Sequence, residues 1–354
     1  AKGMLMLYQL LCKFFLKLPG AVWVTGQPKL QRLVFYYVVL AGILAWLWYE
    51  KKPQRKSEAE SNNRVRNLRF NRIALTLFYL GLLICSMQKE EKRFQIQVLD
   101  VGQGDGIYIE SDAGTEIFVD GGSVDVSEVG KYRIRPFLKS HGVREVDYWF
   151  VSHCDADHCN GLMELLETDY PIKHLVFSKY VLKDEAQEEL AALAKQKGCQ
   201  VLYMEEGECF RDTSIRIQAI YPSEKSVEGE RNADSLVLLL EHGNFHGLLT
   251  GDIGSEQEKK LIETYGEVCD SRNIDWYKAA HHGSKTSNSK ELLDALQPKI
   301  ATISCGQDNS YGHPGKEAVE HMQDAGAEIF QTTECGQIGI TEEDGKIIIF
   351  KRLA

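Results

Sequence analysis

The stretch Tyr148-Trp-Phe-Val-Ser-His-Cys-Asp-Ala-Asp-His-Cys-Asn-Gly161 holds the densest group of metal-binding residue types in this 354-residue chain. Its apolar start, residues 148–151, predicts a buried strand, and Gly161-Leu-Met begins an apolar helical face. Residues of this kind at spacings of one and two cannot all face one core. On a tight strand-to-helix loop they can converge on one point and divide between two metal ions. The candidate ligands are His153, Asp155, Asp157 and His158.

A simpler interpretation of this stretch is a polar loop that caps a helix. Asp157 stands where an N-cap residue would, and Asp is a good N-cap. Capping accounts for one of the four residues, however, and leaves both histidines without a role. The pattern therefore favours a metal site.

Charge divides the chain into two parts. Residues 1–88 contain 13 Lys and Arg against 3 Asp and Glu, which leaves 28 basic and 48 acidic residues in 89–354. The net charges are thus +10 and −20. An acidic domain repels the phosphate backbone of nucleic acids, so nonspecific DNA binding by its whole surface is not expected.

The basic part predicts a membrane segment. Residues 33–48 carry no charge and have Tyr and Trp toward their ends, and 73–87 form a second apolar run. Residues 4–18 contain two lysines and favour an interfacial helix. The loop 51–72 has eight basic residues, which indicates a cytoplasmic loop or, alternatively, a nucleic-acid-binding linker. We expect two transmembrane helices in 1–88, a plasma-membrane protein, and an extracytoplasmic domain at 89–354. Because the chain begins with Ala, we also expect a piece of a longer protein.

The acidic part predicts strands that alternate with helices. Helical periodicity marks residues 129–141, 162–168, 185–197, 255–265, 289–296 and 316–325. Strand patterns mark 94–99, 107–109, 116–120, 148–151, 175–177, 201–203, 214–220, 235–241, 247–250, 275–279, 300–304, 328–331, 337–341 and 346–350. Two sheets packed face to face, with helices outside, accommodate this number of strands better than one open sheet does.

Further candidate ligands follow other predicted strands. Asp252 comes directly after 247–250, and a single carboxylate there could bridge two ions. His281 and His282 follow 275–279, and His313 lies on a later loop. Each signal is weak alone, since a strand-end Asp usually forms a turn and a loop His is usually solvated. Their repetition at strand ends, where α/β sites are assembled, strengthens the prediction.

The order of these motifs resembles the metallo-β-lactamase superfamily. Asp120 precedes His153-x-Asp-x-Asp-His158, then Asp252, then His281-His282-Gly. The family loop is usually H-x-H-x-D-H, so Asp155 replaces a histidine, and Arg231-Asn-Ala-Asp-Ser occupies the region of the usual mid-domain histidine. These departures resemble ComEC-type DNA-uptake (competence) proteins. So do three further motifs, Leu99-Asp-Val-Gly-Gln-Gly-Asp105, His-His-Gly-Ser284 and Tyr311-Gly-His-Pro.

This resemblance implies an α/β metallo-β-lactamase fold, an αββα sandwich of two mixed sheets, preceded by transmembrane helices. It implies a metal-dependent DNA phosphodiesterase with two divalent ions. The added carboxylates make Mn²⁺ as suitable as Zn²⁺. The expected ligands are His153, Asp155, Asp157, His158, Asp252 and His281 or His282. Asp157 and His313 are the expected catalytic residues, with Asp105, Asp120, Asn232, Ser235 and Ser284 around the ligands. Basic residues beside the histidine pair, Lys278 and Lys285, are expected to help contact DNA.

The resemblance also implies partners and a location. The domain would degrade the non-transported strand, as single-stranded DNA, at the outer face of the membrane. It would work with channel helices and a DNA-binding domain that this sequence does not include. Two other functions stay open, a non-catalytic domain that guides DNA and a phosphodiesterase for another envelope phosphoester. Stoichiometric metal binding favours an enzyme over a guiding domain.

Overall fold

The computed structural model describes residues 2–16, 21–22, 24–50, 73–78, 81–82, 92–272, 274–343 and 345–352. The chain divides into two compact units, residues 1–91 with 139–143, and residues 92–138 with 144–354.

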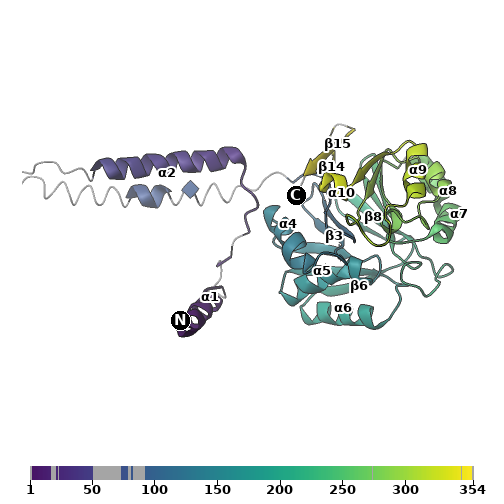
Figure 1. The fold of residues 1–354 in the computed structure, drawn as a ribbon, viewed down its shortest axis with the longest axis horizontal. Coiled ribbons are helices and arrows are strands. Elements are labelled where there is room, and N and C mark those ends of the chain that lie inside the picture. The colour runs from purple at the N-terminus through teal and green to yellow at the C-terminus, as the bar shows by residue number, and fades with distance from the viewer. Residues whose placement is uncertain are drawn as a thin grey trace, which may run out of the picture. The chain divides into compact units, whose positions relative to one another are not determined.

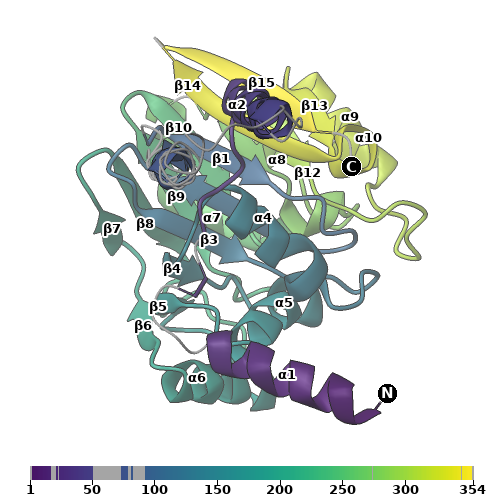
Figure 2. The same cartoon turned by 90° about the vertical axis from the view of Figure 1, so that its left-hand side faces the viewer.

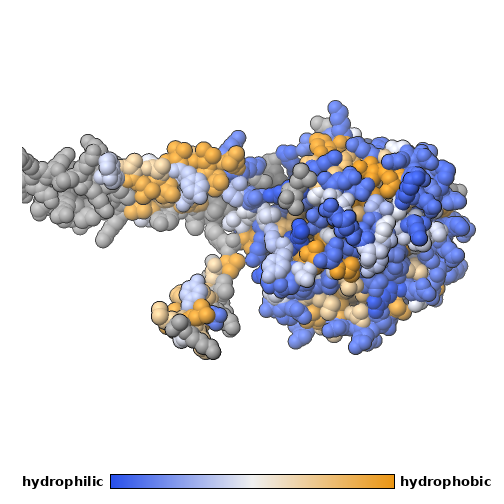
Figure 3. Space-filling model, viewed as in Figure 1, coloured by the Kyte–Doolittle hydropathy of each residue, from blue (hydrophilic) through white to orange (hydrophobic). Residues whose placement is uncertain are grey.

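The first unit contains helices α1 (Lys2–Leu16) and α2 (Leu30–Glu50). The predicted apolar run 33–48 lies within α2, where several large apolar side chains are exposed, including Phe35 and Val38 (Figure 3). Within the described ranges, no helix combines the length and apolar character needed to cross a bilayer, so the predicted transmembrane helices are not found there. The predicted loop 51–72 lies outside the described residues, as do residues 79–80 and 83–87 of the second apolar run.

The second unit is built on two sheets. The first has the order β15-β14-β1-β2-β3-β4-β5-β6, and the second has the order β13-β12-β11-β10-β9-β8-β7. The first comprises β1 (Gln95–Val98), β2 (Gly106–Glu110), β3 (Glu116–Asp120), β4 (Val146–Phe150), β5 (Ile172–Ser178), β6 (Gln200–Met204), β14 (Gln337–Glu343) and β15 (Lys346–Arg352). The second comprises β7 (Cys209–Arg211), β8 (Ile215–Tyr221), β9 (Val237–His242), β10 (Phe245–Leu249), β11 (Trp276–Lys278), β12 (Ile300–Ile303) and β13 (Glu328–Gln331).

Both sheets are mixed. Strands β3 to β6 run parallel in the first sheet, and β10 to β13 run parallel in the second. The other pairs are antiparallel, including β14 and β15, which extend the first sheet beyond β1 (Figure 2). Parallel strands need crossover connections, and helices supply most of them here.

Helices cover the outer faces of both sheets (Figure 1). They are the π-helix η1 (Gly130–Ile134), α4 (Arg135–Ser140), α5 (Ala156–Glu167), α6 (Glu185–Gln196), α7 (Ser255–Arg272), the 3-10 helix η2 (Ala280–Gly283), α8 (Lys290–Leu296), α9 (Lys316–Asp324) and α10 (Thr332–Cys335). Apolar side chains from α7, α8 and α9 form one buried cluster with the outer face of β11 and β12.

The main core lies between the two sheets. Alternate residues of each strand point into it, as Ile96 and Val98 of β1 do, and they meet residues of the second sheet such as Leu238 and Trp276. Burying each such side chain contributes roughly 1.5–3 kcal/mol, so this layer is the main source of stability. The predicted sandwich of two mixed sheets with outer helices is confirmed.

The structure corrects the start of one helix. We predicted that the helix after the central strand begins near Gly161, but α5 begins at Ala156. Asp157 and His158 therefore lie in its first turn, and the N-cap position belongs to Asp155, whose side chain makes no capping hydrogen bond. The first turn is polar because it faces the site, which hides it from a search for apolar periodicity.

Candidate metal centre

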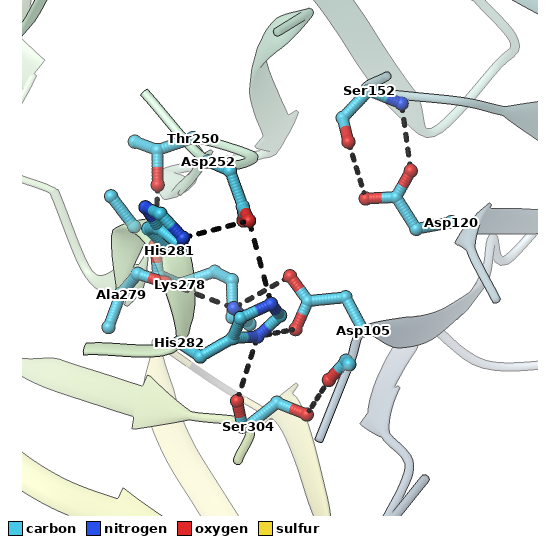
Figure 4. Close-up of polar contacts among 12 residues, drawn as sticks. Asp105, Asp120, Ser152, Thr250, Asp252, Lys278, Ala279, His281, His282 and Ser304 are labelled. Atoms are coloured by element: carbon cyan, nitrogen blue, oxygen red, sulfur yellow. Dashed lines mark hydrogen bonds and ion pairs between the residues drawn. The ribbon is translucent and has the colours of Figure 1, made fainter. Parts of the chain in front are cut away.

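The candidate site lies where the carboxyl ends of parallel strands from both sheets meet. Asp120 ends β3, and His153 closely follows β4. From the second sheet, Asp252 follows β10 and His282 follows β11 (Figure 4). Ligand sites form at this edge in α/β proteins because loops from several strands converge there.

Four side chains form what we call the ligand group, namely Asp157, His158, Asp252 and His282. Each offers one ligand atom, and these atoms all lie within 4.8 Å of one another. His158 Nε2 lies 3.2 Å from Asp252 Oδ1, and His282 Nε2 lies 3.4 Å from Asp157 Oδ2 and 3.5 Å from Asp252 Oδ2.

The inward atoms of the ligand group lack hydrogen bonds. His158 Nε2, His282 Nε2 and Asp252 Oδ1 are buried and make none. Buried polar atoms are nearly always satisfied, so an exception of this kind indicates an absent partner. Two imidazoles and two carboxylates are a donor set that suits Zn²⁺ or Mn²⁺, and these residues therefore fit a divalent cation.

A second set of residues, which we call the supporting layer, holds the ligand group in place. It consists of Asp105, Asp120, Ser152, Lys278 and Ser304. Asp120 Oδ2 lies 3.0 Å from His158 Nδ1, and the Ser304 carbonyl oxygen lies 3.0 Å from His282 Nδ1. Each contact fixes the outer ring nitrogen, so both imidazoles present Nε2 inward.

Asp120 is itself held firmly. Its two carboxylate oxygens accept hydrogen bonds from the backbone N–H and the hydroxyl of Ser152, at 2.7 and 2.9 Å. Trp149 Nε1 donates to the Asp120 carbonyl oxygen at 2.6 Å. The residue has a positive φ of 58° and ends β3. Such backbone strain is found where the surroundings fix a functional geometry.

Lys278 and Asp105 form a buried ion pair beneath His282. Their charged atoms are 2.8 Å apart, and each residue is 1% exposed. Burial alone would raise the pKa of Asp105, but the Lys278 ammonium and His282 outweigh it and hold that pKa well below its usual range. The prediction that Lys278 contacts DNA is wrong, because its ammonium group is buried and forms an ion pair with Asp105. Lys285 is exposed.

The carboxylates also set the pKa of the inward imidazoles. Burial alone lowers the pKa of His158 and His282, but Asp252 beside them outweighs it. The pKa of His158 is raised well above its usual value, and that of His282 is raised to about 9. A metal ion requires neutral imidazoles, so metal binding releases these protons.

The structure separates the two adjacent histidines. His282 is buried and points into the ligand group, whereas the His281 side chain is 30% exposed and its Nε2 lies 3.7 Å from Asp252 Oδ2. Both have left-handed backbone conformations, with φ of 49° and 54°. The tight turn after β11 sends successive side chains in different directions, so His282 is the member of the pair that the group includes.

His153 and Asp155 stand beside the ligand group. His153 Nδ1 lies 3.0 Å from Ser152 Oγ and 3.3 Å from Ser235 Oγ, and its Nε2 lies 3.5 Å from Asp155 Oδ2. Asp155 Oδ1 accepts a hydrogen bond from the Arg231 guanidinium at 2.6 Å. Asp155 therefore has a protein cation as its partner.

His313 lies on the rim of the site. Its ring centroid is 5.5 Å from that of His281, and the Gln103 amide donates to Nδ1 at 3.3 Å. Burial, with the neighbouring imidazoles, lowers the pKa of His313 to about 4. The ring is therefore neutral at pH 7, with its proton on Nε2. This state suits donation of a hydrogen bond better than delivery of a proton to a leaving group.

Of three residues predicted to lie around the ligands, Ser235, Ser284 and Asn232, the structure places one in the site. Ser235 belongs to the site, since its hydroxyl also accepts from the Asp252 backbone N–H at 3.2 Å. The Ser284 hydroxyl pairs with Thr286 in its own turn, at 2.9 Å. Asn232 contributes its carbonyl oxygen to a turn that ends at Ser235 N. Asn232 and Ser284 are therefore parts of the scaffold rather than neighbours of the ligands.

Sequence reasoning missed several members of the site. Ser152 and Ser304 were not singled out, although each directly follows a predicted strand or ends one. Arg231 was noted only as part of the segment that replaces a histidine. The two serines could have been predicted from their positions at strand ends. The pairing of Arg231 with Asp155 could not, because it depends on the fold.

With this geometry, the class of the protein follows from comparison with known families. Residues 99–307 match the family model of the metallo-beta-lactamase superfamily. The chain therefore belongs to this superfamily of metal-dependent hydrolases, whose fold binds divalent metals.

Individual proteins with similar sequences indicate a smaller group within the superfamily. The chain is 27% identical over 279 residues to ComE operon protein 3 of Bacillus subtilis, covering 75% of this chain and 35% of that protein. It is 27% identical over 248 residues to competence protein ComA of Neisseria gonorrhoeae, covering 70% and 32%. The chain thus spans about a third of the length of these relatives. The predicted resemblance to competence proteins is confirmed.

A solved structure with a similar fold is CmlA, a diiron β-hydroxylase from Streptomyces venezuelae. The TM-score is 0.46 and the sequence identity is 15%, with 72% of this chain and 55% of that chain covered.

Proposed function

We propose that this chain is a metal-dependent phosphodiesterase that cleaves DNA during DNA uptake. The observation that carries the proposal is the ligand group, in which two imidazole nitrogens and a carboxylate oxygen are buried without hydrogen bonds. The relatives named for competence support DNA as the substrate. Superfamily membership supports hydrolysis as the reaction.

The chemistry divides between the ligand group and the rim. Asp157, His158, Asp252 and His282 would hold the metal, which when bound polarises a phosphoryl oxygen and activates water. The supporting layer holds the Nδ1 atom of each imidazole, at Asp120 and at the Ser304 carbonyl oxygen, and so aims both Nε2 atoms inward. His313, neutral and with its proton on Nε2, would donate a hydrogen bond to a phosphate oxygen as charge develops there.

The acidic surface limits how DNA reaches this site. Residues 89–354 carry a net charge of −20, so the domain by itself attracts DNA weakly. Lys285 is exposed near the histidine pair and would offer one local phosphate contact. Delivery of single-stranded DNA by channel helices and a separate DNA-binding domain would compensate for the unfavourable net charge.

Location is part of the proposal. The basic loop 51–72 between two apolar runs supports a plasma-membrane protein whose domain 89–354 lies outside the cytoplasm. On this view the enzyme degrades the strand that is not transported. A reporter fused after residue 354 that is active only in the cytoplasm would contradict this orientation.

The test of catalysis is Asp157→Asn. Asn keeps the shape but removes the anion that offsets the charge of the metal, so we expect cleavage of labelled single-stranded DNA with Mn²⁺ or Zn²⁺ to fall at least about 100-fold. Circular dichroism should be unchanged, since Asn is tolerated in a first helical turn.

Asp294→Asn is the matched control. Asp294 forms an exposed ion pair with Lys290 on α8, and its loss should leave cleavage unchanged. Full activity of Asp157→Asn with unchanged metal content would refute the catalytic assignment. A wild-type protein that binds metal and DNA without cleaving DNA would instead support a guiding domain.

A further inference from the structure

Arg231 brings a permanent positive charge to the side of the site where His153 lies. Its guanidinium donates to Asp155 Oδ1 at 2.6 Å and to Asp184 Oδ2 at 2.5 Å. The side chains of Arg231 and Asp155 are 36% and 34% exposed, so the pair is partly buried. A guanidinium stays protonated at every pH that the protein experiences.

The remaining ligand atoms on that side are few. His153 Nε2 is buried without a hydrogen bond, like the inward atoms of the ligand group, but the carboxylate beside it, with Asp155 Oδ2 at 3.5 Å, is already paired with Arg231. Among the described residues, the groups of three or more side chains able to hold a metal are the ligand group and the trio Asp105, Asp120 and His158. Neither group includes His153 or Asp155.

The trio is not a second metal site. Asp105 is neutralised by Lys278, and Asp120 is saturated by Ser152 and by the outer nitrogen of His158. These residues form the supporting layer. A second ion would therefore have to be bound by His153, Asp155 and whichever Asp252 oxygen does not bind the first ion.

We infer that the centre binds one divalent ion, at the ligand group, and that Arg231 supplies at Asp155 the positive charge that a second ion would otherwise provide. This inference rests on the metal centre of the proposed function and replaces the two ions predicted from the sequence. Asp155 is a poor ligand because its Oδ1 is already held by the guanidinium, which it shares with Asp184. A dication approaching it would also be repelled by the adjacent guanidinium.

The experiment counts ions in the full 354-residue chain. The protein is stripped with a chelator and titrated with Mn²⁺, and bound metal is measured by elemental analysis and electron paramagnetic resonance. We expect one ion per chain, with the spectrum of an isolated Mn²⁺. Arg231→Met should bind a second ion and show the spectrum of a coupled pair. Asp155→Asn should keep one ion.

Arg216→Met is the matched control, since Arg216 forms a similar partly buried pair with Glu241 away from the site. It should keep one ion. Two ions in the wild-type protein, a single ion in Arg231→Met, or loss of the ion in Asp155→Asn would each overturn the inference. The count does not depend on cleavage, so a one-ion protein that fails to cut DNA would refute the proposed function and leave this inference standing.

Discussion

Asp105 in the supporting layer and Asp252 in the ligand group are both buried carboxylates beside His282, but they have different partners. Asp105 pairs with the Lys278 ammonium at 2.8 Å. The charged partners that the structure gives Asp252 are imidazoles. A buried charge needs compensation. Asp105 has a cation within the chain, whereas Asp252 depends on protons or on a metal ion. The first carboxylate therefore serves the fold, and the second serves binding.

The largest expected effect comes from removing the cation of the supporting layer. Lys278→Met leaves Asp105 buried without its ammonium partner, which should lower the free energy of unfolding by about 3–5 kcal/mol. Urea denaturation with a chelator present measures this loss. Asp105→Asn combined with Lys278→Met removes both charges and should recover most of it. Equal losses in the single and double variants would show that the pair is not what makes Asp105 tolerable.

Asp252→Asn should have the opposite profile. Its removal takes a ligand from the centre, so the affinity for Mn²⁺ or Zn²⁺ should fall by more than about 100-fold, beyond what changes around metal ligands cost. Without metal, the Asp252→Asn protein should lose less stability than Lys278→Met does, because the substitution leaves no buried lysine or arginine unpaired. Isothermal titration calorimetry and urea denaturation measure the two quantities. A stability loss as large as that of Lys278→Met would erase the distinction between the two carboxylates.

The smallest effect is the pH dependence of the metal-free protein. The pKa of His282 is raised from 6.5 to about 9, and that of His158 is also raised. Their stabilisation is therefore complete below pH 6.5 and is lost as pH rises through about 9. The lowered pKa values of His281 and His313 act below pH 6.5. Stability with chelator should thus fall between pH 6.5 and 9. Because metal binding releases a proton from each of two imidazoles, metal affinity should rise over the same range by up to about 100-fold per pH unit.

Urea denaturation across this pH range measures the trend, and His282→Asn is its control. That variant loses one of the two raised groups, so its stability should depend less on pH. A metal-free wild-type protein whose stability does not change from pH 6.5 to 9 would mean that Asp252 is not compensated by protons.

Membership of the fold class was predictable from local patterns. Alternation in β1 and β14 and helical periodicity in α6 and α9 depend on neighbours two to four residues away, so a sequence displays them directly. Two short elements, β7 and α10, were missed because their sequences, Cys-Phe-Arg and Thr-Thr-Glu-Cys, contain too few apolar residues to show a pattern. The start of α5 was misplaced because its first turn is polar.

The sequence by itself determined which residue types could hold a metal and that they follow strands, since Asp120, His153, Asp252 and His282 all stand at or just beyond strand ends. Only the tertiary structure decided which of them converge. It turned His282 inward and left His281 partly exposed, through a left-handed turn. It also joined Arg231 to Asp155 across 76 residues and buried Lys278 against Asp105. The physical reason is that these ion pairs form between loops brought together by the packing of the two sheets. The spacing of residues along the chain does not indicate which loops come together.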